Sequence, residues 1–442
     1  MVRAALLLAL VWRGADAAAP QPSVKWLIVG GGPHGVHIAT RLLKEVDGVS
    51  LENLRIVDDE GRLLHKWKTR TASTGMRYLR SSASFHLDSD TPAGCGRGLK
   101  RYAERRSERG VFAKDYMRPL LKVFNDHCDH VLRETDLGEA HLRGTVTALL
   151  PDGDAAVEVR VRRHGGDAAT VRAENVVLAL GNDAPAYPDW VDPRLLRTGK
   201  LRHVLDDDDD GFKVRGSVAI VGGGLSAAHL ALSLADGADV HVICRHDVRE
   251  QQFDTHQDWM MTSEEASFMG RALTKRQLEF AGVRSFAERR AIVESERRAG
   301  TLPAAVSRGT GGLRYAIRNE RLRWHRAEVE AATERDDGTV ALSLSTGDDV
   351  AVDHVVLATG FAKGLPGRDL VDAVARRAGL DVGPCGYPAP SPSLRWHDRI
   401  FVAGALAELE LGPSARNLAG ARLASERIVA AAQRRGASSL PS

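Results

Sequence analysis

A glycine-rich loop between a short apolar segment and a helical pattern occurs twice in this chain, and it constrains the fold more than any other feature. The apolar segment 24–29 (VKWLIV) precedes Gly-Gly-Gly-Pro-His-Gly at 30–35, and VAIV at 218–221 precedes Gly-Gly-Gly-Leu-Ser-Ala at 222–227. Short, continuously apolar segments are typical of strands buried on both faces of a parallel sheet. Each copy therefore predicts a strand, a tight turn and a helix of the kind that binds a dinucleotide.

The two copies continue and close in the same way. A second strand is predicted at 54–57 after the first copy and at 239–244 after the other. Each copy then leads, through short strands and turns, to a closing strand, VVLALG at 176–181 and VVLATG at 355–360. Such an internal repeat is not expected of a motif that matches by chance. We therefore predict an α/β chain with two Rossmann-like dinucleotide-binding domains.

The first loop has the spacing Gly-x-Gly-x-x-Gly. The first glycine of this pattern permits a tight turn, the second lets a pyrophosphate approach the backbone, and the third lets helix and strand pack closely. These positions are Gly30, Gly32 and Gly35. Pro33 and His34 complete the loop, and a proline suits the first turn of a helix whose amide groups and positive dipole end face bound phosphates. The first loop is therefore a candidate pyrophosphate site.

The residue after the second strand indicates which ribose each domain binds. Asp58 ends the strand of the first copy, and its carboxylate can accept both hydroxyl groups of an adenosine ribose. Asp59 or Glu60 takes this role if the strand ends later. Arg245 stands at the corresponding place in the second copy. A guanidinium binds a 2′-phosphate with two hydrogen bonds, whereas a carboxylate repels it, so we predict that the second domain binds NADPH.

Two dinucleotide sites in one chain predict two cofactors that act together. We expect FAD in the first domain and a dissociable NADPH in the second, because hydride passes between stacked rings. In the second loop Ala227 replaces the third glycine. The NADPH contacts expected there are Gly222, Gly224, Leu225 and Ser226.

The repeat also predicts the domain boundaries. We assign 24–205 and 351–435 to a discontinuous FAD-binding domain, and 212–350 to the NADPH-binding domain. Asp206 to Asp210 form a run of five aspartates between them, which we interpret as a solvated loop. The charged stretch at about 250–325 does not continue the strand and helix pattern. We expect it to be a helical insertion in the second domain that shapes access to the active site.

Composition and charge exclude several classes of protein. The chain has 442 residues, 61 Lys and Arg against 58 Asp and Glu, and a net charge of +3, so no strong field attracts nucleic acid. The longest apolar run, at 4–12, is far shorter than the roughly 20 residues of a membrane-spanning helix. The four cysteines are widely spaced, which excludes a CxxC dithiol and a clustered zinc site. We therefore expect neither a nucleic-acid partner nor a transmembrane segment in the mature chain.

The first 19 residues resemble a secretory signal peptide. Arg3 precedes the apolar run, and Ala15-Asp16-Ala17 matches an A-x-A cleavage pattern. The expected location is therefore the secretory pathway, in the lumen of the endoplasmic reticulum or outside the cell. A leader that directs the protein to an organelle can begin in the same way. An alanine-rich tail on a cytosolic protein is the other alternative, because Arg13 and Asp16 lie close to the apolar run.

Several segments together resemble a known family. Gly199-x-x-x-His203 precedes the second loop, an Ala-Thr-Gly-Phe segment at 358–361 follows the second closing strand, and Gly404 and Gly412-Pro413-Ser414 precede the last helical pattern. With the first glycine loop, these motifs resemble the flavin-dependent monooxygenases, in particular the lysine/ornithine N-hydroxylase-like and class B flavin-containing group. The resemblance spans about residues 24 to 430.

The resemblance implies further cofactor contacts. The stretch 65–90 is similar to the family segment that flanks the flavin or the substrate, and it includes His86. In the closing segment, a helix N-terminus facing the flavin stabilises the negative charge of the reduced ring. The contacts implied in this way are Trp67, Met76, Arg77, Gly181, His203, Thr359, Gly360, Gly404, Gly412 and Pro413.

The resemblance also implies a reaction. NADPH reduces FAD, reduced FAD adds O₂ to give a C4a-hydroperoxide, and a small nucleophilic amine or sulfur substrate takes one oxygen atom. This chemistry needs few protein acids or bases, and we assign no catalytic residue. Arg197 and Asp207 stand where the family signature has aromatic residues. The alternatives are therefore an NADPH-dependent reductase or oxidase without oxygen insertion, and a non-catalytic redox-sensing flavoprotein.

Overall fold

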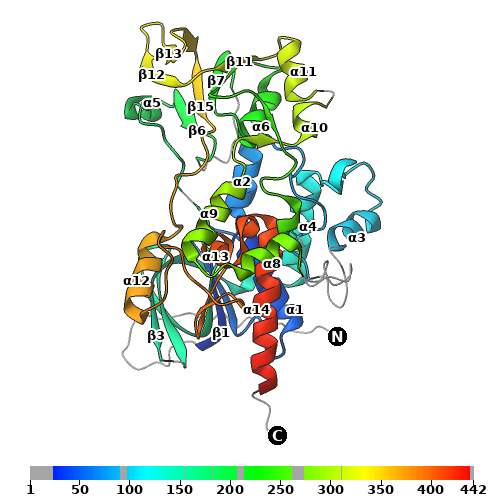
Figure 1. Ribbon diagram of the computed structural model, residues 1–442, viewed down its shortest axis with the longest axis vertical. Helices are drawn as coiled ribbons and strands as arrows, with labels where there is room; N and C mark the ends of the chain where they lie inside the picture. Colours follow the sequence, from blue (N-terminus) through cyan, green and yellow to red (C-terminus); the bar gives the residue numbers. More distant parts are fainter. Residues whose placement is uncertain are drawn as a thin grey trace, which may run out of the picture.

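The protein has two lobes, each built on its own parallel sheet (Figure 1). The computed structural model describes residues 23–89, 97–153, 155–182, 184–206, 214–260, 273–309 and 311–438. The N-terminal and C-terminal thirds of the chain form the first lobe, at the bottom of Figure 1, and much of the middle third forms the second lobe. The candidate signal peptide lies outside the described residues, and the first strand begins at Ser23.

The sheet of the first lobe has β1 (Ser23–Val29) at its centre. β1 pairs in parallel with β2 (Leu54–Asp58) and with β5 (Ala168–Leu178), and β5 pairs in parallel with β17 (Ile400–Val402). The edge strand β16 (Arg395–His397) is antiparallel to β17. Leu27 and Ile28 of β1 are fully buried, as expected of a strand that is covered on both faces.

Two long strands extend this sheet into an antiparallel layer. The start of β3 (His141–Asp152) pairs in parallel with β2, and the rest pairs with β4 (Ala156–Arg163). The start of β5 pairs with β4, and its end pairs with β1. The short strands that the sequence indicates between the second strand and the closing strand are therefore one three-stranded layer, which is continuous with the parallel sheet.

The last helix closes the lobe that the first strand begins. α14 (Leu418–Ser438) packs along α1 (Pro33–Glu45), with Leu42 and Ile428 fully buried (Figure 1). Arg41 of α1 donates a hydrogen bond to Ser425 Oγ at 3.3 Å. This lobe also contains α2 (His65–Ser73), α3 (Gly98–Arg105), α4 (Leu121–Glu134), α12 (Arg368–Ala378) and α13 (Glu408–Leu411).

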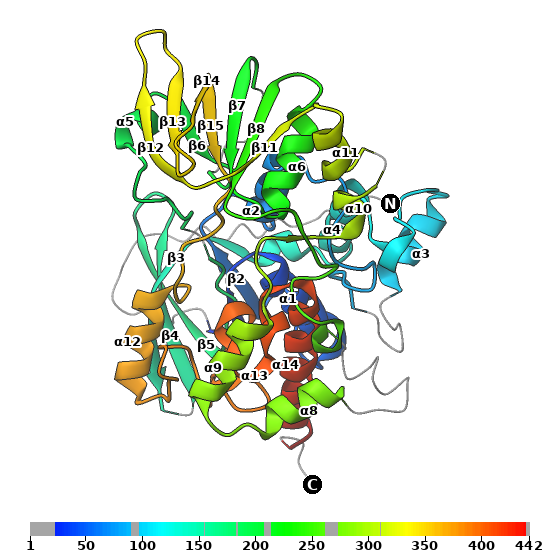
Figure 2. The ribbon, with the colours of Figure 1, turned by 45° about the horizontal axis from the view of Figure 1, so that its top comes forward.

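The second lobe has a five-stranded sheet in which every described pairing is parallel. Helices α6, α10 and α11 cover one face of this sheet, and the antiparallel strands β12 to β14 cover the other face with α5 (Figure 2). The strands, in sheet order, are β11 (Arg323–Arg326), β8 (Asp239–Cys244), β7 (Ser217–Val221), β15 (His354–Leu357) and β6 (Leu201–His203). The covering elements are α5 (Pro193–Arg197), α6 (Leu225–Leu234), α10 (Ala304–Ser307), α11 (Leu313–Arg318), β12 (Val329–Glu334), β13 (Val340–Leu344) and β14 (Asp349–Val352). The predicted α/β fold with two dinucleotide-binding domains is confirmed.

The chain crosses between the lobes at two places. At the first, the segments that follow β5 and β15 run side by side in opposite directions, with Pro185 paired to Phe361 and hydrogen bonds on both sides of that pair. We call these two segments the paired linkers. At the second, β9 (Arg249–Glu250) pairs with β10 (Thr301–Leu302), where the chain leaves the second lobe and returns to it. Arg80 of the first lobe donates hydrogen bonds to the carbonyl groups of Gln251 and Gln252 at this crossing.

The helical stretch between β9 and β10 differs from its prediction. We expected an insertion in the second lobe, but α8 (Lys275–Gly282) and α9 (Phe286–Glu296) pack on α13 and on the segment after it, in the first lobe (Figure 2). Arg290 and Arg297 donate hydrogen bonds to the buried carboxylate of Glu408, which draws α9 to that lobe. Only the end of the predicted insertion, with α10 and α11, belongs to the second lobe.

Two predicted domain boundaries also need correction. We assigned residues up to 205, and again from 351, to the first domain, but β6 and β15 belong to the sheet of the second lobe. The reason is that β15 lies between β7 and β6 and completes the parallel sheet, so the chain leaves the first lobe soon after β5 and returns after β15. The predicted loop from Asp206 to Asp210 falls almost entirely outside the described residues.

Two properties of the described residues concern membranes and metal ions. Across these ranges, every helix is too short or too polar to cross a bilayer. The same part of the chain contains no group of three or more His, Cys, Asp or Glu side chains placed to hold a metal ion. Its cysteines, Cys128, Cys244 and Cys385, are free thiols.

Candidate functional site

The first glycine loop has the close approaches that its pattern predicts. Gly30 has φ +112°, and a Cβ atom there would lie 2.5 Å from the carbonyl oxygen of Ala179. A Cβ atom at Gly35 would lie 1.9 Å from the carbonyl oxygen of Gly30. At Gly32, by contrast, a Cβ atom would meet nothing within 4 Å. The first and third glycines are thus required by the protein itself, and the second leaves open space where a pyrophosphate would lie.

The helix behind this loop presents uncapped amide groups. α1 begins at Pro33, and its N-cap residue Gly32 offers no side chain to the amides of the first turn. No acidic side chain lies in that turn. Free amide groups and the positive end of the helix dipole together attract an anion. This geometry fits the diphosphate of FAD.

His34 lies beside the same loop, and its ring makes no hydrogen bond of good geometry to the protein. Both of its ring nitrogens are buried and unpartnered, and burial lowers the pKa of His34 to about 4. The ring is therefore neutral at pH 7. Gly404, with φ +62°, and the backbone of Arg416 and Asn417 lie next to it. Buried polar groups without partners normally have one in the complete protein, so His34 fits a role as a hydrogen-bond partner of FAD.

Asp58 fixes the glycine loop to the end of β2. One carboxylate oxygen accepts a hydrogen bond from the Gly31 amide at 2.6 Å, and the other accepts one from the Glu60 amide at 3.0 Å. A carboxylate can accept about four hydrogen bonds, so Asp58 can still bind a ribose hydroxyl group. Asp59 and Glu60, the alternatives for this role, both lie 3.3 Å from Lys66 Nζ.

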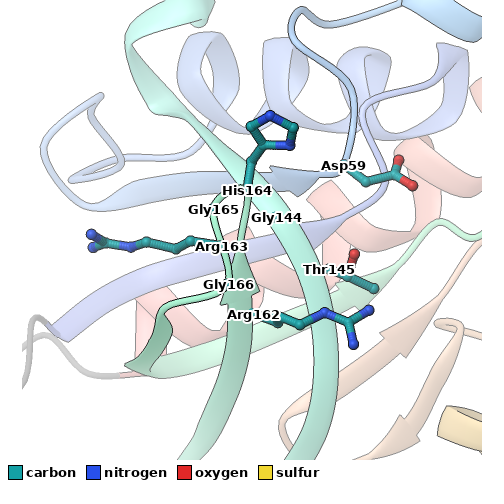
Figure 3. A pocket seen from close by; sticks show the side chains of 8 residues that line it. All are labelled: Asp59, Gly144, Thr145, Arg162, Arg163, His164, Gly165 and Gly166. Atoms are coloured by element: carbon teal, nitrogen blue, oxygen red, sulfur yellow. The ribbon is translucent and has the colours of Figure 1, made fainter.

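A pocket of about 280 Å³ lies at this end of the first lobe (Figure 3). Asp59 and Thr145 line it from the end of β2 and from β3, and Arg162 lies on the neighbouring strand β4. The other lining residues are Gly144, Arg163, His164, Gly165 and Gly166. The pocket adjoins the predicted ribose site.

The predicted flavin-flanking residues gather around a second pocket of about 510 Å³. Met76 and Arg77 line it, together with Asn125 of α4. Trp67 of α2 donates a hydrogen bond from Nε1 to Asn125 Oδ1 at 3.0 Å. His86 is not among the residues that line the pocket; it is fully buried and packs against the ring of His127 at 5.4 Å. Their contact with flavin stays a prediction.

The second glycine loop repeats the geometry of the first with one difference. Gly222 has φ +140°, and a Cβ atom there would lie 2.4 Å from the carbonyl oxygen of Ala358, as Gly30 approaches Ala179. A Cβ atom at Gly223 would lie 2.1 Å from Cys244 Sγ. In the first loop the equivalent glycine faces Asp58. Cys244, and not Arg245 as we predicted, therefore occupies the position of Asp58.

Arg245 is the next residue and remains available to a ligand. Its side chain is 77% exposed and lies 3.5 Å from Glu328, an exposed pair of the kind that contributes little to stability. α6 begins at Leu225, with Gly224 as an N-cap residue that has no capping side chain, and Ser226 follows in the first turn. The alanine at position 227 is buried within the lobe. These features fit the phosphates of NADPH.

His203 and Thr359, predicted from separate motifs, are in contact. The Leu205 amide donates to His203 Nδ1 at 3.1 Å, so the ring carries its proton on Nε2 and donates it to Thr359 Oγ1 at 3.1 Å. Thr359 in turn donates to the carbonyl oxygen of Ala186 at 2.5 Å. Burial lowers the pKa of His203 to about 4, which keeps this arrangement neutral at pH 7. The chain of hydrogen bonds fixes the paired linkers to the second lobe.

The remaining predicted glycines lie at the ends of these segments. Gly360 has φ +82° and begins its linker, while Gly181 begins the other one. A Cβ atom at Gly412, where φ is +75°, would lie 2.8 Å from the ring of Trp259. Pro413 begins the short helical turn that leads to α14. Gly412 is thus required by packing against the insertion, which its sequence pattern did not indicate.

Two features of the site were missed in the sequence. The ring of Tyr187 lies 5.5 Å from that of His203, and its hydroxyl group donates to Asp206 at 2.8 Å. Glu408 is fully buried and accepts hydrogen bonds from three arginines. An acid inside the apolar run that precedes Gly412 is a visible signal for the second feature. No pattern indicated the first.

Two phosphate-binding loops and paired linkers between two parallel sheets define a flavoprotein oxidoreductase with two dinucleotide-binding domains. The sequence profile described as FAD-NAD(P)-binding matches residues 27–183. The profile described as L-lysine 6-monooxygenase/L-ornithine 5-monooxygenase matches residues 113–363, more than half of the chain. The chain belongs to the L-lysine 6-monooxygenase/L-ornithine 5-monooxygenase family, and it is an FAD- and NADPH-dependent enzyme.

Solved structures share this fold at low sequence identity. Ornithine hydroxylase PvdA from Pseudomonas aeruginosa superposes with a TM-score of 0.69 at 18% identity, over 93% of this chain and 99% of that one. The cadaverine monooxygenase DfoA from Erwinia amylovora superposes with a TM-score of 0.67 at 15% identity, over 93% of this chain and 94% of that one. L-lysine 6-monooxygenase from Pseudomonas syringae superposes with a TM-score of 0.66 at 18% identity, over 93% of this chain and 99% of that one. No curated protein sequence matches the chain significantly.

Proposed function

We propose that the protein is a monooxygenase that transfers one oxygen atom of O₂ to the nitrogen of a small primary amine. The amine, O₂, NADPH and a proton would give a hydroxylamine, NADP⁺ and water. The observation that carries this proposal is the arrangement of the two glycine loops, each at the end of a sheet that the paired linkers join. Family membership and the amine substrates in the names of the similar structures support it.

The protein's own groups bind and orient the cofactors in this reaction. FAD and NADPH, when bound, supply hydride transfer and the activation of O₂. Gly32 and the α1 amides would hold the diphosphate of FAD, with His34 beside them. The neutral His203 holds Thr359, and with it the segment that connects the two sites. This chemistry needs few protein acids or bases, and we assign no catalytic residue.

Product analysis tests the proposal. The FAD-loaded enzyme is mixed with NADPH, O₂ and L-lysine, L-ornithine or cadaverine, and hydroxylamine, H₂O₂ and NADPH consumption are measured together. We expect one of these amines to give hydroxylamine in nearly equal amount to the NADPH consumed. NADPH oxidation that yields only H₂O₂ with every amine would contradict amine oxygenation and would identify an oxidase.

Arg197 and Asp207 stand where the family signature has aromatic residues, and this difference favours an oxidase. Arg197 ends α5, and Asp207 lies outside the described residues. Tyr187, however, places an aromatic ring against His203 from a different segment. The linker region therefore retains an aromatic contact with His203, so the loss of the signature aromatics alone does not establish an oxidase.

Arg245→Asp is expected to reverse the preference for NADPH over NADH. The ratio of the two kcat/KM values should fall by about 10- to 100-fold, because a charge-assisted pair of hydrogen bonds to the 2′-phosphate is replaced by repulsion. Steady-state flavin reduction with each nucleotide measures this ratio. Arg335→Asp, an exposed charge reversal at the end of β12, is the matched control and should leave the ratio unchanged. An unchanged ratio in Arg245→Asp would remove Arg245 from the site.

We also propose that the first 19 residues are a cleaved leader for the secretory pathway or an organelle. The apolar run and the A-x-A pattern support this proposal. N-terminal sequencing of the protein from its native cells should give a first residue close to Ala18. An intact N-terminus would contradict cleavage.

A further inference from the structure

Each of the paired linkers begins close to a glycine loop. The carbonyl oxygens of Ala179 and Ala358 approach the first glycine of the first and second loop, respectively. Asn182 and Phe361 follow them along the two linkers. The nicotinamide ring must lie against the flavin for hydride to pass between them. The positions of the two linkers therefore affect how the two cofactors meet.

One side chain of the first lobe touches both linkers. Arg70 belongs to α2, which lies between the two sheets (Figure 1, Figure 2). Its Nη1 atom donates a hydrogen bond to the carbonyl oxygen of Asn182 at 3.3 Å. Its Cζ atom lies over the ring of Phe361, 5.4 Å from the ring centre. Arg70 thus joins the two linkers to each other and to α2.

Other contacts fix α2 independently of Arg70. At the end of the helix, Ser73 Oγ donates a hydrogen bond to the carbonyl oxygen of Val204, the residue after β6, at 2.8 Å. One turn earlier than Arg70, Trp67 Nε1 donates to Asn125 of α4 at 3.0 Å. A substitution of Arg70 is therefore expected to leave α2 in place while the linkers lose their attachment to it.

The two contacts of Arg70 together require a guanidinium group. A guanidinium is flat, so it can donate hydrogen bonds in its plane while its face packs on an aromatic ring. The ammonium group of a lysine has the same charge but lacks this flat face. Burial is the main cause of the lowered pKa of His203, and the positive charge of Arg70 adds to it. Arg70 therefore also helps to keep His203 neutral, as the hydrogen bond from the Leu205 amide requires.

We propose that Arg70 is a positioning residue for hydride transfer from NADPH to FAD. By binding both Asn182 and Phe361, it fixes the two linkers and, with them, the distance between the two dinucleotide sites. Without it both cofactors still bind, because the two glycine loops are unchanged, but they meet less often in the reactive arrangement. This role concerns flavin reduction, so it does not depend on whether an amine is oxygenated afterwards.

Anaerobic stopped-flow reduction of the full-length, FAD-loaded protein by NADPH tests this role. In Arg70→Met, the reduction rate at saturating NADPH should fall at least about tenfold, because small errors in the placement of reacting groups slow a reaction strongly. The dissociation constant for NADP⁺, measured by calorimetry, should be nearly unchanged. Arg70→Lys should restore only part of the rate, since it keeps the charge without the flat group. Arg133→Met, at an exposed arginine in the last turn of α4, is the matched control.

Hydrogen exchange examines the linkers without NADPH and without turnover. The Ala186 amide donates to the carbonyl oxygen of Gly360 at 2.8 Å, and the Ala362 amide donates to that of Ala184 at 2.9 Å. Both amides should exchange faster in Arg70→Met than in the unaltered protein, because the linkers open more easily when they are not held to α2. Amides of β1 should exchange at an unchanged rate.

Three results would overturn the role of Arg70. They are an unchanged reduction rate, a slower rate with unchanged exchange of both linker amides, and a weakening of NADP⁺ binding that accounts for the whole effect. If Arg70→Met does not fold, Phe361→Leu carries the test, since it removes the ring contact and leaves the bond to Asn182. It should show the same two effects at smaller size. Because O₂ and amine are absent, a failure of amine oxygenation would not alter any of these results.

Discussion

Gly32→Leu is expected to give a folded protein without FAD. A Cβ atom at this position meets no protein atom within 4 Å, so the leucine side chain can be accommodated in the apoprotein. It would, however, occupy the space in which the pyrophosphate approaches the backbone. Bound FAD should fall from about one per chain to below about 0.1, as measured by visible absorbance after purification. Circular dichroism should show an unchanged content of helix and strand.

Gly138→Leu is the matched control for this substitution. Gly138 lies in a short helical turn, has no positive φ and also meets no atom within 4 Å, so the variant should retain FAD. Gly35→Ala should behave differently from both variants, because its Cβ atom would collide with the Gly30 carbonyl group and disturb the fold itself. A Gly32→Leu protein that purifies with normal FAD content would refute the assignment of the first lobe.

Glu408→Ala is expected to cause the largest loss of stability of any single substitution considered. The carboxylate is fully buried and accepts hydrogen bonds from Arg290, Arg297 and Arg416 at 2.5 to 3.1 Å. Removing it leaves three positive charges in a largely buried cluster, and breaking a buried pair in this way costs about 3–5 kcal/mol. The denaturation midpoint of the first lobe, followed by FAD release in urea, should fall accordingly.

Glu294→Ala provides the comparison. Glu294 also pairs with Arg290, at 2.9 Å, but its side chain is 62% exposed. Exposed pairs contribute about 0.2–1 kcal/mol, so the midpoint should scarcely change. Equal effects of the two substitutions would show that Glu408 does not hold α9 to the first lobe.

The parts of the fold that were predictable are those in which short-range geometry fixes the residue type. The apolar strands before Gly30 and Gly222, and the glycines themselves, follow from contacts between neighbouring turns of chain. The structure repeats these contacts nearly identically, with Ala179 and Ala358 as the matching partners. The spacing of residues in such a local motif is therefore enough to predict the structure around it.

The parts that were not predictable depend on contacts between distant segments. Nothing in the sequence of the charged helix α9 indicates which lobe it packs on. Its arginines bind Glu408, which is more than 100 residues away in the chain, and this contact holds it to the first lobe. The boundaries failed for a similar reason, because only the sheet pairing shows that β6 and β15 belong together. Arg245 comes one residue after the position that corresponds to Asp58, and only the contact between Gly223 and Cys244 shows this.

The two crossings between the lobes restrict how the second lobe can move. One crossing is the pairing of Pro185 with Phe361, and the other is the pairing of β9 with β10, which Arg80 holds to the first lobe. A rigid body that is attached at two separate points retains a single rotation, about the line through those points. Rotation about the line through the two crossings is therefore the movement that keeps both attachments, and it would have to break a further contact between the lobes, in which Ser73 of α2 donates to the carbonyl oxygen of Val204 at 2.8 Å.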